Sequence, residues 1–87
     1  MHTIYKYQIK PGDPGIKLPL GSEVLYGGVQ NGEFFIWALV DHSETEFVER
    51  EFAVLGTGWE IEEYPNVDFI STVFEGPYVW HIFEILK

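Results

Sequence analysis

The sequence closes on Tyr78-Val79-Trp80-His81-Ile82-Phe83-Glu84-Ile85-Leu86-Lys87, the stretch that decides the fold. Successive side chains of a β-strand point to opposite faces, so this run places apolar residues on both faces. One face holds Tyr78, Trp80 and Ile82, and the other holds Val79, His81, Phe83 and Ile85. A small domain normally buries one face of each strand. Two apolar faces therefore predict a strand inside a layered core, a strand closed into a barrel, or a strand that buries its second face against a partner.

Alternating apolar and polar residues, separated by turn residues, recur along the rest of the chain and predict an all-β or mostly-β domain. Residues 34–40 share the two apolar faces of the closing stretch, so we expect both to be central strands. Residues 3–9 carry Lys6 and Gln8 on one face and are expected at an edge. About six mainly antiparallel strands should form a small sandwich or partly open barrel, as one domain over residues 1–87.

Two turns and one bulge are predicted from local sequence. Asn31-Gly32 favours a type I′ hairpin turn, because both central positions of that turn need positive φ. Glu75-Gly76-Pro77 should join the last two strands, residues 67–74 and 78–86. Gly27-Gly28 lies inside an expected strand, residues 24–30, and indicates a bulge or a sharp bend.

Residues 43–55 fit two structures. Ser43 with Glu46 three residues later resembles a capping box that opens a helix. Against this, Val48, Arg50 and Phe52 alternate with glutamates, which favours a strand. The strand interpretation places Arg50 on the inward face, where its charge needs a carboxylate, a partner or a ligand anion.

Charge is concentrated in the second half of the chain. Residues 1–40 carry three acids and three lysines, whereas residues 41–87 carry eleven acids against Arg50 and Lys87, so the net charge is −9. Such a field repels phosphate backbones and argues against direct binding of nucleic acid. The chain has no cysteine, no apolar run of about 20 residues and no signal-peptide pattern, so a cytoplasmic protein without membrane contact is expected.

None of the short polar motifs predicts catalysis, a metal or a cofactor. Asp41-His42-Ser43 contains the residue types of a hydrolytic triad, but adjacent side chains diverge and cannot make its contacts. The histidines and acids lack the spacing of zinc and calcium sites. Gly56-Thr57-Gly58 lacks the lysine of a nucleotide loop, although backbone N–H groups in such a bend can hold an anion. We therefore expect a protein that is not an enzyme.

Two residues point instead to binding. Trp59 lies in a loop rich in glycine and glutamate, where an exposed indole more often marks a contact surface. His81 is expected to be a buried, hydrogen-bonded residue rather than a catalyst, because the closing strand is apolar on both sides.

Several segments together resemble a small family of uncharacterised bacteriophage and bacterial proteins, described only as a domain of unknown function. The resemblance rests on the I-Y-K-Y motif at residues 4–7, W-A-L-V-D at 37–41, G-T-G at 56–58 and V-W-H-x-F-E at 79–84. It implies a phage-type context, in which small proteins of this size often antagonise host defence. It transfers no functional residue.

From these observations we expect a homo-oligomer, in the host cytoplasm if the protein is phage-encoded, that sequesters a small anionic, nucleotide-derived signalling molecule. The expected ligand-binding residues are Arg50, Thr57, Gly58, Trp59, Trp80 and His81. One alternative is an acidic inhibitor or nucleic-acid mimic that blocks a basic site on a host protein. Its expected interface residues are Glu44, Glu46, Glu60, Glu62 and Glu63. A second alternative is a phage accessory or structural module.

Overall fold

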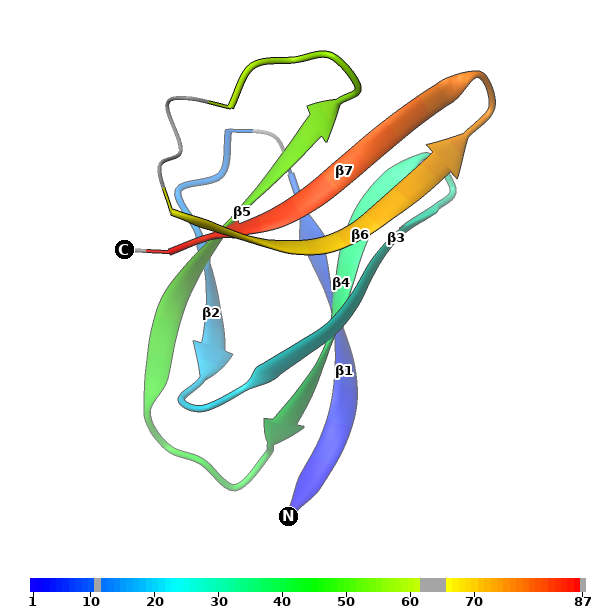
Figure 1. The fold of residues 1–87 in the computed structure, drawn as a ribbon. Coiled ribbons are helices and arrows are strands. Elements are labelled where there is room, and N and C mark those ends of the chain that lie inside the picture. The colour runs from blue at the N-terminus through cyan, green and yellow to red at the C-terminus, as the bar shows by residue number, and fades with distance from the viewer. Residues whose placement is uncertain (11, 62–65, 87) are drawn as a thin grey trace.

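Seven β-strands and no helix occur in the residues that the computed structural model describes, which are 1–10, 12–61 and 66–86 (Figure 1). They are β1 (His2–Ile9), β2 (Ile16–Pro19), β3 (Glu23–Gln30), β4 (Glu33–Asp41), β5 (Phe47–Gly56), β6 (Val67–Glu75) and β7 (Tyr78–Ile85). The all-β prediction is confirmed, with one strand more than the expected count of about six.

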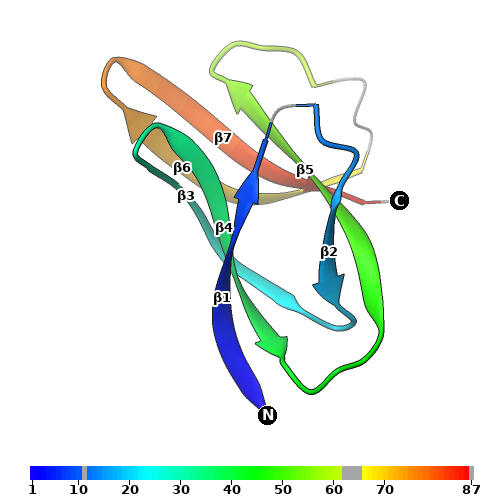
Figure 2. The same cartoon turned by 180° about the vertical axis from the view of Figure 1, so that it is seen from behind.

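The strands form two antiparallel sheets that pack face to face (Figures 1 and 2). One sheet has the order β1-β4-β3, and the other has the order β2-β5-β7-β6. At one side of the sandwich β3 lies against β6, and the Gly27 N–H donates to Ser71 Oγ at 2.9 Å. The sheets therefore form a sandwich that is not closed into a barrel. β1 lies at a sheet edge, as predicted.

Both apolar stretches occupy interior strands, β4 in one sheet and β7 in the other. Their inward residues meet in the core, where Ile36 and Ile82 are fully buried. The core cluster draws on both sheets and consists of Ile9, Leu18, Ile36, Val73 and Ile82. The second face of β7 forms the outer surface of the four-stranded sheet, where its side chains remain half-buried.

The predicted turns and the strand interpretation of residues 43–55 are confirmed. Asn31 and Gly32 have φ values of 53° and 77°, as a type I′ turn requires. Gly76 follows β6 and has a φ of 56°. Most of residues 43–55 belong to β5, which begins at Phe47, so the helical alternative does not apply.

The predicted bulge at Gly27-Gly28 is wrong. Both glycines pair in regular register with β4, and the irregularity falls at Leu25, between Val24 and Tyr26. A second irregularity falls in β6, between Phe69 and Ser71. The glycines serve close packing instead, because a Cβ on Gly27 would lie 2.8 Å from Ile82 Cδ1.

Among the described residues, no helix has the length and apolar character needed to cross a membrane.

Candidate functional site

The six predicted ligand-binding residues fall into two groups, one near the end of β5 and one further back on the same strand. Thr57, Gly58 and Trp59 follow the end of β5, and the register pairs Gly56 with Trp80 and Leu55 with His81. Arg50 lies six residues before Gly56, which is about 20 Å along a strand. The structure therefore brings five of the six residues to one end of the sandwich and leaves Arg50 apart from them.

Arg50 is committed to a partner within the protein. Its Nε donates to Glu84 Oε2 at 2.6 Å and its Nη2 donates to Glu84 Oε1 at 2.8 Å. Its Nη1 donates to the Ser22 carbonyl oxygen at 2.6 Å. This bidentate pair is enclosed, with side-chain exposures of 19% for Arg50 and 12% for Glu84. The hydrogen bond to Glu84 raises the pKa of Arg50 above its ordinary value. The carboxylate partner expected for Arg50 is thus Glu84.

The other group surrounds a surface hollow of about 430 Å³, which we call the aromatic hollow. Its lining consists of Gly56, Thr57, Trp59, Pro77, Tyr78, Val79 and Trp80. The rings of Trp59 and Trp80 meet edge to face, with centroids 5.8 Å apart and planes at 84°. The ring centroids of Tyr78 and Trp80 are 6.0 Å apart, and the two ring planes are tilted by 31° to each other.

Local sequence explains why these rings gather. Trp59 lies over Gly56, where a Cβ would come within 2.9 Å of the indole. Trp80 is held from within by an edge-to-face contact with Phe34 at 5.7 Å. Its Nε1 also donates to Glu75 Oε1 at 3.1 Å. Trp59 nevertheless remains 59% exposed, as the sequence predicted, so its ring is available for contact.

The aromatic hollow is lined by uncharged described residues, and the charged group hydrogen-bonded to one of its rings is a carboxylate. No lysine or arginine is among its described lining residues, and Glu75 is hydrogen-bonded to Trp80. Lys10 lines the neighbouring hollow on Trp59, but that hollow also contains Asp13, Glu51 and Glu60. The faces of aromatic rings beside a carboxylate attract cations and neutral rings more than anions.

A chain of three hydrogen-bonding side chains crosses the outer face of the four-stranded sheet. Thr57 Oγ1 lies 2.8 Å from His81 Nε2, and Thr72 Oγ1 lies 2.9 Å from His81 Nδ1. Thr72 is the cross-strand partner of His81 on β6, whereas Thr57 follows β5 by one residue. The expected hydrogen bonding of His81 is confirmed, but the residue is half-buried rather than buried. Thr72 was missed, because its pairing depends on strand register.

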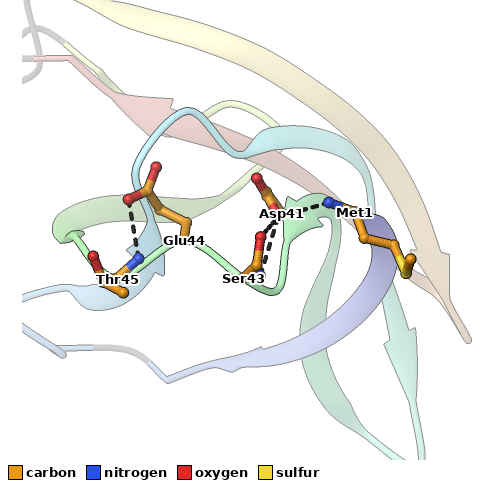
Figure 3. Close-up of polar contacts among 5 residues, drawn as sticks. All are labelled: Met1, Asp41, Ser43, Glu44 and Thr45. Carbon is orange, nitrogen blue, oxygen red and sulfur yellow. Dashed lines mark hydrogen bonds and ion pairs between the residues drawn. The ribbon is translucent and has the colours of Figure 1, made fainter.

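Asp41, His42 and Ser43 form a turn rather than a triad (Figure 3). The Ser43 hydroxyl and N–H both donate to Asp41 Oδ1, at 2.6 and 3.0 Å, and the Met1 ammonium group lies 3.1 Å from the same oxygen. Hydrogen bonds from Ser43 hold the pKa of Asp41 well below its ordinary value. The His42 backbone N–H donates to the Met1 carbonyl oxygen. These contacts close the turn after β4.

The acids of the predicted interface do not form one continuous face. Glu44 and Glu46 precede β5, Glu60 follows it, and ten strand residues span about 30 Å. Glu44 Oε2 accepts the backbone N–H groups of Thr45 and Glu46, at 3.0 and 3.1 Å. Figure 3 shows the first of these bonds. Glu62 and Glu63 lie outside the described residues.

Within the described ranges, no three histidine, aspartate or glutamate side chains come together as a metal site requires.

Comparison with known proteins identifies a family but no characterised relative. No curated protein and no solved structure matches the chain. A family model matches residues 1–86, almost the entire chain. The protein therefore belongs to DUF7352, a family described as a domain of unknown function.

Proposed function

We propose that the protein acts by binding, and that the aromatic hollow receives a positively charged group of its partner. The observation that carries this proposal is the pair of Trp59 and Trp80 rings, set edge to face beside a carboxylate. A cation over a tryptophan face gains about 0.5–2 kcal/mol, more as water is excluded. The net charge of −9 would draw a basic partner towards the protein.

The proposed partner is a basic protein that inserts a lysine, arginine or methylated ammonium group into the hollow. This corresponds to the acidic-inhibitor alternative drawn from the sequence, with the contact moved from scattered glutamates to the aromatic rings. A phage setting and a host-defence target rest on the family resemblance alone.

A small anionic ligand is a weaker proposal for the same hollow. Arg50, the expected source of positive charge, is paired with Glu84 and lies about 20 Å away along β5. Stacking on Trp59 would remain available to a nucleobase, but no lysine or arginine is among the described lining residues to pair with its phosphate. An anionic ligand would then need a cation from a second copy of the chain.

Tryptophan fluorescence titrations with matched probes test the proposal. The cationic arm uses Nα-acetyl-lysine amide, its trimethylated form and Nα-acetyl-arginine amide. The anionic arm uses AMP and a cyclic dinucleotide, and the neutral arm uses Nα-acetyl-norleucine amide, whose unbranched side chain is uncharged. We expect saturable quenching by the cations only, with trimethyl-lysine binding at least about tenfold more tightly than norleucine, a difference of roughly 1.4 kcal/mol.

Two substitutions test whether the probes bind in the aromatic hollow or elsewhere on the surface. Trp59→Ala should abolish the cationic response, because Trp59 supplies the exposed indole ring of the hollow. Trp37→Phe is the matched control, because Trp37 lies on β4 and contacts Tyr26 instead. Equal binding of the lysine and norleucine probes would refute the cation proposal. Tight binding of the dinucleotide alone would restore the anionic one.

A further inference from the structure

We infer that Thr57 is an activated hydroxyl that accepts acyl groups from ester donors, with His81 as its general base and Thr72 as a positioning residue. This inference goes beyond the proposed binding function and does not depend on a cation in the aromatic hollow. The expectation of a non-enzymatic protein arose because no nucleophile–base pair could be found in the sequence. The fold places such a pair together, across 24 residues of chain.

The register accounts for this geometry. Leu55 and Thr72 flank His81 as its two cross-strand partners, on β5 and β6. Thr57 follows Leu55 by two residues, so it returns to the same outer face at the end of β5. The three polar side chains therefore meet on a face whose other outward positions on β6 and β7 are apolar. His81 has a polar partner on each ring nitrogen, which fixes the plane of its imidazole.

The hydrogen bonds suit proton transfer from Thr57. A neutral imidazole donates from one nitrogen and accepts at the other. When Nδ1–H donates to Thr72 Oγ1, Nε2 accepts the hydroxyl proton of Thr57 at 2.8 Å, within the range for a general base. This arrangement matches the nucleophile, base and orienting group of a hydrolytic site, with a threonine in the third role.

Thr57 is also accessible to a substrate. It is exposed in the turn after β5, and it lines the aromatic hollow of about 430 Å³. The Thr57 N–H donates to the Val79 carbonyl oxygen and the Trp59 N–H donates to Gly56. The N–H of Gly58 between them donates to no other described residue, and Gly58 has a φ of 90°. That N–H can stabilise an oxyanion beside Thr57.

The reaction balances without a metal or a redox partner. Thr57 Oγ1 forms a bond to the ester carbonyl carbon, and its proton passes to His81 Nε2. The carbon–oxygen bond to the leaving alcohol breaks as His81 returns the proton to that oxygen. The products are an acyl ester of Thr57 and a free alcohol, and water releases the acyl group by the same path.

Acetylation by p-nitrophenyl acetate tests the inference on the whole chain, through nitrophenolate release and peptide mass spectrometry of the acid-quenched protein. Thr45 is the internal control, because it is an exposed threonine whose hydroxyl contacts no described histidine. We expect the acetyl group on Thr57, with the rate lost in Thr57→Val and recovered relative to that variant in Thr57→Ser, which restores the hydroxyl. His81→Gln should slow the reaction about a hundredfold.

Thr72 is tested by rescue. Thr72→Val should slow acetylation of Thr57, and Thr72→Ser should restore it, because serine returns the hydroxyl that holds the imidazole. Circular dichroism and thermal unfolding show whether each variant retains the fold. Equal labelling of Thr45 and Thr57, or an unchanged rate in His81→Gln, would reduce the three residues to a structural hydrogen-bond chain and overturn the inference. An acetyl group on His81 that persists in Thr57→Val would overturn it in favour of a histidine nucleophile.

Discussion

At the scale of single residues, Arg50 and Glu84 form the enclosed ion pair of the described structure. Glu84→Ala would leave the guanidinium group half-buried, with only the Ser22 carbonyl oxygen as a described partner. Removing one member of such a pair costs about 3 kcal/mol. We expect that loss in the free energy of unfolding, measured by urea denaturation. The control is Glu49→Gln, at an exposed position on β5 next to Arg50. It should change the free energy of unfolding by less than about 0.5 kcal/mol. A loss below 1 kcal/mol in Glu84→Ala would contradict an enclosed pair.

Asp41 gives a prediction for pH at the same scale. Hydrogen bonds from Ser43 lower its pKa in the folded protein, so the carboxylate form favours folding. That contribution is complete above the unfolded pKa, about 3.9, and is lost as the pH falls through the lower folded pKa. We expect the carboxyl ¹³C resonance of Asp41 to titrate well below 3.9. Ser43→Ala should move this midpoint upward. A midpoint at the ordinary value in the wild type would rule out the Ser43 hydrogen bonds.

At the scale of elements, the packing of β3 against β7 depends on Gly27. A methyl group on Gly27 would lie 2.8 Å from Ile82 Cδ1 and 3.2 Å from Ile82 Cγ2, and Ile82 is fully buried. Overpacking of a well-packed core costs about 2 kcal/mol of the free energy of unfolding. We expect Gly27→Ala to lower the free energy of unfolding by that amount in urea denaturation.

Gly28→Ala is the matched control, because it adds the same methyl group to the next residue on the opposite face. There the methyl group would approach the rings of Tyr26 and Trp37 at 3.1 and 3.3 Å. Tyr26 is exposed and can move aside, so we expect less than about 1 kcal/mol. Equal losses in the two variants would show that strand propensity, rather than contact with Ile82, sets the cost.

The sequence predicted those features of the elements that depend on neighbouring residues. Alternation in residues 78–85 identified both faces of β7, and Asn31-Gly32 identified the turn between β3 and β4. Features that depend on how strands pair and on how the sheets pack could not be predicted from the sequence. Gly27 was interpreted as a bulge because its contact with Ile82 crosses between sheets. The pairings of Arg50 with Glu84 and of His81 with Thr72 join segments whose spatial order the sequence does not contain.

At the scale of the whole molecule, the two candidate sites meet at Thr57. It lines the aromatic hollow with its neighbour Trp59, and its hydroxyl begins the chain through His81 to Thr72. The loops after β5 and β6 supply this end of the sandwich, while the turn after β4 lies at the other end (Figure 1). A partner bound in the hollow would therefore cover Thr57, which means that binding and acyl transfer can be measured as competing events.

The outer face of β6 and β7 is an apolar surface on a highly charged molecule. None of the outward positions of β6 and β7 carries an acid, although the chain has a net charge of −9. At one end of this face Phe69, which is 60% exposed, meets Phe83 edge to face at 5.6 Å. Two copies of an acidic protein repel one another except through such a surface, so this face suits the expected homo-oligomer.

We therefore expect a dimer at micromolar concentration in size-exclusion chromatography with light scattering. Phe69→Glu should convert it to a monomer, because it places a like charge on each side of the contact. Ile4→Glu makes the same change at an exposed apolar position of β1, on the other sheet, and should leave the dimer intact. A monomeric wild type would refute every proposal that needs a second copy, including a cation donated to an anionic ligand. It would leave the proposed cation site and the reactivity of Thr57 standing, because both are built from one chain.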